Sequence, residues 1–298
     1  MSKASQTAIA NADSVANVGA LVEVLAVALE AGNVSEPHRE AGDIVAALLD
    51  VPRFWPSANA ESKVSGAMVA AAVRAAQQRV IGAPLAYAVG RASFRHLTLE
   101  VDDRVLIPRV ETELLVDRFL ERCDQHIRTV VDIGTGSGAI ALSLAFEHDF
   151  DRVVGTDVSR GALAVAQKNL DLLRPALRSP VELVHGALLA PLANEKVDAI
   201  VSNPPYIVYS ESASLPPSVR DWEPAVALLS AGDGLSVTRG IVDQASHALR
   251  PGGILALEVD VRRAGTVAEL VAVEGSYTEV EVLLDLSGRE RFVFARRR

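Results

Sequence analysis

Cysteine and aromatic residues are scarce in this chain. Of its 298 residues, one is cysteine and 4% are aromatic. The single thiol, Cys123, excludes an intrachain disulfide and a zinc site built from several cysteines. It lies within an amphipathic helical pattern, so we interpret it as a packing residue. Since hydrophobic residues still make up 49% of the chain, aliphatic side chains must form most of the core.

A net positive charge and long apolar runs are also lacking. A net charge of -9 argues against broad binding to a phosphate backbone, so direct nucleic-acid binding is not expected. No run approaches the roughly 18 apolar residues of a membrane span. The N-terminal residues include Asp13 and no apolar signal segment. We therefore expect a cytoplasmic protein with no membrane and no metal site, while its oligomeric state stays unknown.

Helical patterns occupy the first part of the chain. They run over residues 14–31, over 36–49 after Ser35 as a possible N-cap, and over 61–81. These patterns contain no obvious chemistry, which favours a structural or recognition module over residues 1–85.

The pattern changes to near-alternation of apolar and polar residues over 87–109, with Asp102 and Asp103 at a turn. This predicts a β-hairpin linker over 86–108, followed by a larger domain over 109–298. In the larger domain strands alternate with helices, which predicts a doubly wound α/β sheet. Two closing strands without a helix between them predict an antiparallel hairpin at its edge. The expected strands are 128–133, 152–157, 181–185, 197–202, 254–259, 279–284 and 291–295, with a turn at 251–253.

The segment Asn203-Pro204-Pro205-Tyr206 follows one of these strands. Its two prolines lack backbone N–H groups and fix two φ angles, so they predict a stiff loop with free carbonyl acceptors. The Asn203 side chain adds a carbonyl and Tyr206 adds a flat face with a polar tip. Together these groups could hold a planar amide or an aromatic amine. Taken alone, the four residues also fit a plain Pro-Pro turn.

A glycine-rich segment, Gly134-Thr135-Gly136-Ser137-Gly138, joins the first expected strand of the larger domain to a helix. Its glycines allow a tight turn and the close approach of a ligand. Asp157 ends the next strand, 19 residues beyond Gly138, where its carboxylate can accept hydrogen bonds from both hydroxyls of a ribose. The order G-x-G-x-G lacks the third glycine of a dinucleotide fold at its usual place. A nucleoside without phosphates, such as S-adenosylmethionine, therefore fits better than NAD.

Taken together, these segments resemble class I S-adenosylmethionine-dependent methyltransferases, and within them the protein-(glutamine-N5) methyltransferases that modify peptide-chain release factors. The resemblance covers roughly residues 80–298. The N-P-P-Y segment is shared with adenine-N6 DNA methyltransferases, whereas the linker that contains Pro108 and Arg109 is more specific. The matching segments are 82–87, Gly90, Phe94, 106–109, 111–113, 132–138, 203–207, 222–224 and 288–289.

The resemblance implies a Rossmann-like methyltransferase sheet with an antiparallel terminal hairpin, a small N-terminal helical domain for substrate recognition, and the β-hairpin linker. It implies S-adenosylmethionine as the cofactor and a release factor as the protein partner. Because an amide nitrogen is a poor nucleophile, catalysis would rest on positioning and electrostatics. The residues implied to bind the cofactor are Gly134, Thr135, Gly136, Ser137, Gly138, Asp157, Leu188 and Asn203; those implied to hold the glutamine amide are Asn203, Pro204, Pro205 and Tyr206.

Three departures from the family leave alternatives open. Ala187 stands where the family commonly has an aspartate near the adenine, Val110 replaces a proline, and residues 258–261 replace a glycine-bearing stretch. The expected activity is methyl transfer from S-adenosylmethionine to a release-factor glutamine. The alternatives are a paralogous methyltransferase for another amide or amine, an adenine-N6 nucleic-acid methyltransferase, and a non-catalytic module that binds the cofactor or a translation factor.

Overall fold

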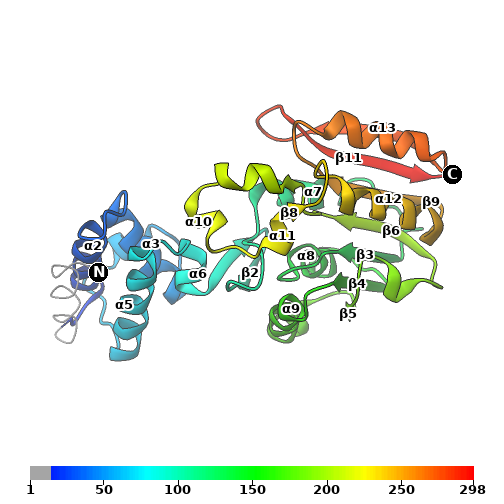
Figure 1. Cartoon of the computed structure of the whole chain (residues 1–298). Coiled ribbons are helices and arrows are strands. Elements are labelled where there is room, and N and C mark those ends of the chain that lie inside the picture. Colours follow the sequence, from blue (N-terminus) through cyan, green and yellow to red (C-terminus); the bar gives the residue numbers. More distant parts are fainter. Residues whose placement is uncertain (1–14) are drawn as a thin grey trace. The chain divides into compact units, whose positions relative to one another are not determined.

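The computed structural model describes residues 15–298, and its internal contacts divide the chain into two compact units. The first unit reaches Arg91 and includes the later segment Pro216–Trp222. The second unit comprises Ala92–Leu215 and Glu223–Arg298. Figure 1 shows the chain coloured along its sequence, with the first unit largely in blue and cyan.

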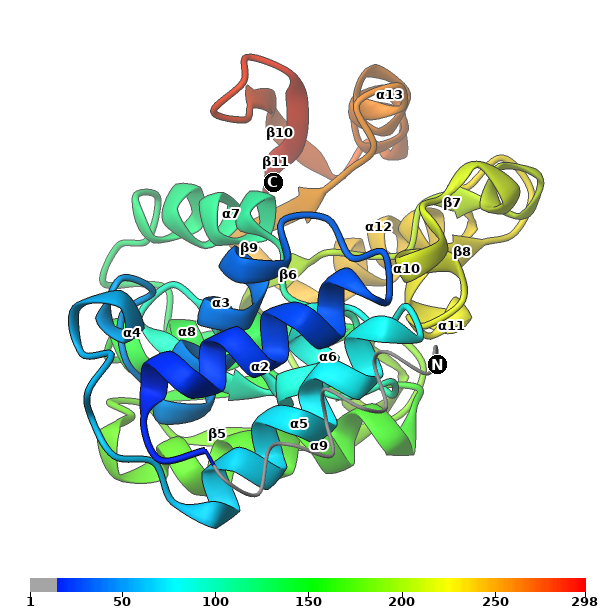
Figure 2. The same cartoon turned by 90° about the vertical axis from the view of Figure 1, so that its left-hand side faces the viewer.

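Helices build the first unit. The longer ones pack on one another through an aliphatic core that includes Leu21, Leu25 and Ile44, and Figure 2 shows them from the front. Aliphatic packing is therefore what holds this unit together, as the composition predicts. Its helices are α2 (Val18–Glu30), α3 (Pro37–Leu49), α4 (Trp55–Ala58), α5 (Gly66–Val80), α6 (Leu85–Val89) and α10 (Pro217–Arg220).

The three predicted helical patterns are confirmed as α2, α3 and α5, but all three helices begin later than predicted, α2 at Val18 after its N-cap Asn17. Helix α5 begins at Gly66 because the Ser65 side chain accepts a hydrogen bond from the Met68 N–H at 3.2 Å. Ser35 does not cap α3. The residue before that helix is Glu36, in the left-handed region at φ 53° and without a side-chain cap. Ser14, the first residue of the first predicted pattern, lies outside the described residues.

The predicted β-hairpin exists, but its turn is not where the sequence placed it. Strands β1 (Arg91–Phe94) and β2 (Leu97–Glu100) pair, and the turn lies at Arg95, whose φ is 52°. Asp102 and Asp103 do lie in a turn, because the Val105 N–H donates to the Asp102 carbonyl at 3.1 Å and the Asp102 side chain accepts from the Arg104 N–H, but this turn follows β2 and does not join the two strands. The segment beyond it is irregular, so the predicted second strand of the hairpin, up to Arg109, is wrong.

A seven-stranded sheet in the order β10-β11-β9-β6-β3-β4-β5 forms the centre of the second unit. Strands β3, β4, β5, β6 and β9 run parallel, whereas β11 pairs antiparallel with both β9 and β10. The predicted α/β sheet with a terminal antiparallel hairpin is thereby confirmed. The strands are β3 (Thr129–Ile133), β4 (Arg152–Asp157), β5 (Val181–His185), β6 (Val197–Ser202), β9 (Leu249–Glu258), β10 (Tyr277–Leu284) and β11 (Glu290–Arg297).

Alternate residues of the strands face two separate cores. Helices α7, α8 and α9 cover the face that carries Val130, and α12 and α13 cover the face that carries Val131. Cys123 packs against the first core, which confirms the packing interpretation, and burial raises its pKa to about 12; it lies after the end of α7, however, and not within a helix as predicted. The helices are α7 (Val110–Leu120), α8 (Ala139–Glu147), α9 (Arg160–Leu173), α11 (Ala225–Leu228), α12 (Ser236–Ala248) and α13 (Ala264–Glu274).

Two features of the second unit differ from the sequence predictions. Strand β9 runs through the predicted turn at 251–253, where Gly252 has a φ of 81° and the pairing with β6 shifts register. The segment after the N-P-P-Y loop contains short elements that the patterns did not indicate, namely β7 (Ile207–Val208), β8 (Leu229–Ser230) and a 3-10 helix, η4 (Tyr209–Ser214). Within residues 15–298, no helix is long and apolar enough to cross a membrane.

Candidate active site

A cavity of about 430 Å³ lies at the carboxyl ends of four parallel strands in the second unit. It is lined by residues that directly follow β3, β4, β5 and β6. In the sheet, β4 lies on one side of β3 and β6 on the other, so the strand order reverses at β3. Ligands of open α/β sheets bind at such a switch point. The fold thus brings the glycine loop and the N-P-P-Y loop to one cavity.

The glycine loop turns sharply because its glycines adopt conformations that other residues rarely reach. Gly134 and Gly136 have φ angles of 73° and 57°, and both line the cavity. The N–H groups of Gly134 and Thr135 both donate to the carbonyl of Thr156, at 2.8 and 3.0 Å. The loop is therefore fixed to the end of β4 and presents backbone rather than side chains to the cavity.

Asp157 connects this loop to the start of α9. One carboxylate oxygen accepts from the Gly136 N–H at 3.0 Å, and the other accepts from the Ser159 N–H at 2.8 Å. Burial raises the pKa of this carboxyl group, and these hydrogen bonds oppose the rise. Each oxygen can accept a further hydrogen bond, and Asp157 lines the cavity, so the predicted bonds to a ribose are compatible with the geometry.

The predicted site residues that line the cavity are Gly134, Gly136, Asp157, Leu188, Asn203, Pro204 and Pro205. Thr135, Ser137 and Gly138 shape the loop instead. The Thr135 hydroxyl donates to Asp132 at 2.7 Å, the Ser137 carbonyl accepts from Asn169 at 2.9 Å, and a Cβ on Gly138 would lie 2.9 Å from Leu142. Their direct contacts with a cofactor stay a prediction.

The N-P-P-Y loop leaves β6 directly into the cavity wall. Pro204 is buried, and within the described part of the chain no donor bonds the carbonyl of Asn203 or Pro204. Tyr206 does not line the cavity, and burial raises its pKa to about 12. The loop therefore has unused carbonyl acceptors on residues that line the cavity, which agrees with the prediction from the two prolines.

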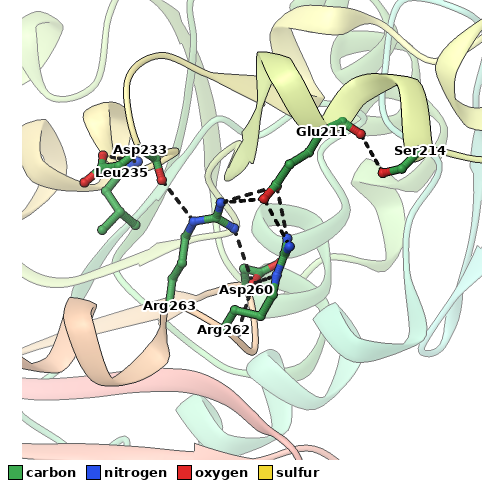
Figure 3. A network of polar contacts seen from close by, with 7 residues as sticks. All are labelled: Glu211, Ser214, Asp233, Leu235, Asp260, Arg262 and Arg263. Atoms are coloured by element: carbon green, nitrogen blue, oxygen red, sulfur yellow. Dashed lines mark hydrogen bonds and ion pairs between the residues drawn. The ribbon is translucent and has the colours of Figure 1, made fainter.

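A network of hydrogen bonds and ion pairs links Glu211, in the segment after this loop, to Arg262 and Arg263 (Figure 3). The Glu211 carboxylate accepts from the guanidinium groups of Arg262 and Arg263, and Arg263 also donates to the carbonyl of Asp233 at 3.0 Å. Asp260, in the stretch that departs from the family, pairs with Arg262 at 3.0 Å. Next to Asp233, a Cβ on Gly234 would lie 2.6 Å from the Tyr206 carbonyl, so the chain fits closely there.

Two segments that carry the resemblance meet in the second unit. The buried Glu223 carboxylate accepts from the Arg109 guanidinium at 2.5 Å and from the Ile107 N–H at 3.2 Å. The adjoining residues Val105 and Leu106 line the cavity. The linker segment thus acts as a wall of the site, a role that sequence patterns did not indicate.

Two further residues next to Asn203 were not predicted as site residues. The Asn203 amide donates to the Thr112 hydroxyl at 2.9 Å, and that hydroxyl donates to Glu258 at 2.7 Å. Thr112 was visible only as part of a matching segment, and Glu258 only as a departure from the family. Their proximity arises from the tertiary fold, so no local pattern could reveal it.

The cavity suits a nucleoside better than a metal ion. Most of its wall is aliphatic, Asp157 is the acidic residue that lines it, and Ala187 leaves no carboxylate at the end of β5. The basic residue in the wall, Arg104, is paired with Asp102. Its volume falls in the usual range for small-ligand sites. In residues 15–298, no group of three His, Cys, Asp or Glu side chains could hold a metal ion.

A doubly wound sheet with this glycine loop, this carboxylate and this acceptor loop defines a class I methyltransferase. The family model of the methyltransferase small domain matches residues 110–214. The solved hMettl16 catalytic domain, in complex with an RNA hairpin, superposes with a TM-score of 0.54 at 18% identity, covering 86% of this chain and 91% of that one. This likeness shows the fold.

Curated relatives narrow the class to one family. The release factor glutamine methyltransferase of Moorella thermoacetica is 41% identical, over 91% of this chain and 95% of its own length. That of Geobacter sulfurreducens is 37% identical, over 88% and 90%, and that of Gloeobacter violaceus 44%, over 70% and 73%. This chain belongs to the release factor glutamine methyltransferase family.

Proposed function

We propose that this chain transfers a methyl group from S-adenosylmethionine to the side-chain nitrogen (N5) of a glutamine in a peptide-chain release factor. One observation carries the proposal. Asn203 and Pro204, whose backbone carbonyls no donor of the described residues bonds, line the same cavity as the glycine loop and Asp157. An amide NH2 held at these acceptors would lie beside a cofactor held at that loop.

Cofactor binding would use the backbone of Gly134 and Gly136, with Asp157 accepting from the ribose hydroxyls. The aliphatic part of the wall, including Leu188 and Ile241, would enclose the adenine. When bound, S-adenosylmethionine supplies an electrophilic methyl group on a positively charged sulfur. Aliphatic walls keep water from competing for that methyl group.

The substrate amide would donate one N–H to the Asn203 side-chain carbonyl and the other to the Pro204 carbonyl. An amide nitrogen has a delocalised lone pair and gains positive charge as it is methylated. Two fixed acceptors aim the nitrogen and stabilise that charge, so alignment and electrostatics supply the rate enhancement. No strong base is needed, since the methylated nitrogen can release its proton to water after transfer.

The helical unit carries no group of this chemistry, and we assign it to recognition of the release factor. Its helices contribute nothing to the cavity wall. Residues 1–85 would thus recognise the release factor, residues 109–298 would methylate it, and residues 86–108 would link the two.

Incubation of the purified chain with a release factor and labelled S-adenosylmethionine tests the proposal. Mass spectrometry should find one added methyl group on a glutamine side chain of the factor. A release factor with that glutamine replaced by asparagine is the matched control, because it keeps the amide but moves it. Label on adenine of a DNA or RNA substrate, with none on the release factor, would overturn the proposal.

A further inference from the structure

A hydrogen-bonded chain of three side chains ends at the N-P-P-Y loop. The Asn203 Nδ2 atom lies 2.9 Å from the Thr112 hydroxyl, and that hydroxyl lies 2.7 Å from Glu258 Oε2. Thr112 stands in the first turn of α7, and Glu258 is the last residue of β9. Thr112 and Glu258 are 5% and 2% exposed, so both side chains are shielded from bulk water.

The two ends of an asparagine amide have nearly the same size, so packing alone does not decide which end faces the cavity. An ionised carboxylate only accepts hydrogen bonds. The Thr112 hydroxyl has a single proton, and when it gives this proton to Glu258 it can only accept from Asn203. The Asn203 NH2 group must then face Thr112, which leaves the Asn203 carbonyl for the cavity.

Resting on the proposed function, we infer that Thr112 and Glu258 are positioning residues that orient the Asn203 amide so that its carbonyl oxygen faces the substrate NH2. In the opposite orientation the Asn203 NH2 would meet the substrate NH2, and two donors would face each other. These hydrogen bonds thus orient the site to accept an amide NH2 group before the substrate binds.

The charge of Glu258 determines which groups donate and which accept in the hydrogen bonds between Glu258, Thr112 and Asn203. Burial raises its pKa to about 7, and the charged groups that face it are Arg291 from β11 and Arg109 and Glu111 from the start of α7, with Tyr206 on the loop. Once protonated, Glu258 can donate to Thr112, and the hydroxyl can then donate to the Asn203 carbonyl. That reversal turns the amide, so the rate should depend on ionised Glu258.

Thr112→Val and Thr112→Ser test the inference as a pair. Valine keeps the shape of the side chain but removes the hydroxyl, whereas serine keeps the hydroxyl. We expect Thr112→Val to lower kcat about tenfold, which corresponds to one net hydrogen bond of about 1.4 kcal/mol, with an unchanged Kd for S-adenosylmethionine. Thr112→Ser should have a kcat close to that of the wild type. Thr238→Val, which removes a buried hydroxyl from α12 outside the cavity wall, should leave kcat unchanged.

Glu258→Gln gives an independent readout if Thr112→Val does not fold. The wild-type kcat should rise with an apparent pKa near 7, and this step should be absent in Glu258→Gln, whose amide does not ionise. Equal kcat values for wild type and Thr112→Val, or the same step in Glu258→Gln, would overturn the inference while the wild type still methylates its release factor. A wild type that leaves release-factor glutamine unmodified would instead overturn the proposed function and the inference with it.

Discussion

Replacing Asp157 by alanine should weaken cofactor binding in two ways. The variant loses the proposed acceptors for the ribose hydroxyls, and each hydrogen bond to a charged acceptor is worth about 1.5–3 kcal/mol. It also releases the Gly136 N–H, which the carboxylate holds at 3.0 Å. Water that enters the half-buried position offsets part of this loss. A net cost of about 3 kcal/mol corresponds to a Kd about 100-fold higher.

Calorimetry with two ligands separates these two effects. S-adenosylhomocysteine carries both ribose hydroxyls, and its 2′,3′-dideoxy analogue carries neither. The analogue cannot make the ribose hydrogen bonds, so Asp157→Ala should change its Kd only through the released Gly136 N–H. The change in Kd should therefore be smaller for the analogue than for S-adenosylhomocysteine. Asp171→Ala, an exposed carboxylate on α9 outside the cavity wall, controls for the change in net charge. An unchanged Kd for S-adenosylhomocysteine in Asp157→Ala, or an equal loss with both ligands, would refute the ribose contact.

Three further results are expected. Ala187→Asp should tighten S-adenosylmethionine binding in calorimetry if an adenine amino group lies at the end of β5, and no gain would show that the site is arranged differently. Burial raises the pKa of Asp132 from 3.8 to about 7, so the folded state holds its proton more tightly. The free energy of unfolding should therefore fall as pH rises from about 4 to about 7, by at most about 1.4 kcal/mol per pH unit, and urea titrations of Asp132→Asn should show a flatter slope. Gly138→Ala, at φ 86° and 2.9 Å from Leu142, should lower that free energy by more than about 1 kcal/mol, whereas Gly42→Ala, inside α3 with open space around it, should raise it by about 0.5–1 kcal/mol; equal effects would contradict the conformational argument.

Local chemistry explains what the sequence predicts well. The central strands β4, β5 and β6 match their predicted bounds because each is a short segment rich in aliphatic residues that ends in a polar residue. Gly134, Gly136 and Asp157 were predicted to lie together, and they line one cavity, because their places depend on backbone conformation and on position at a strand end. Such signals lie within a few residues and need no knowledge of the fold.

Long-range contacts explain what the sequence does not predict. Asp102 does begin a turn, in which the Val105 N–H donates to its carbonyl at 3.1 Å, but the turn that joins the two strands uses Arg95, a residue with no turn preference. The pairing of Thr112 with Glu258 joins residues 146 positions apart. In the sequence, Glu258 was noted only as part of a stretch that departs from the family. It comes close to Asn203 because β9 pairs with β6 in the sheet.

Asn203 carries the central claim, because its side chain is proposed both to select the substrate amide and to align its nitrogen. The most direct measurement is the single-turnover rate of glutamine methylation by Asn203→Ala, at saturating S-adenosylmethionine and with a melting curve that matches wild type. The loss of alignment and of charge stabilisation together should lower this rate by about 10²-fold or more. A rate near that of the wild type would contradict the account, because the N-P-P-Y loop would then not carry the chemistry.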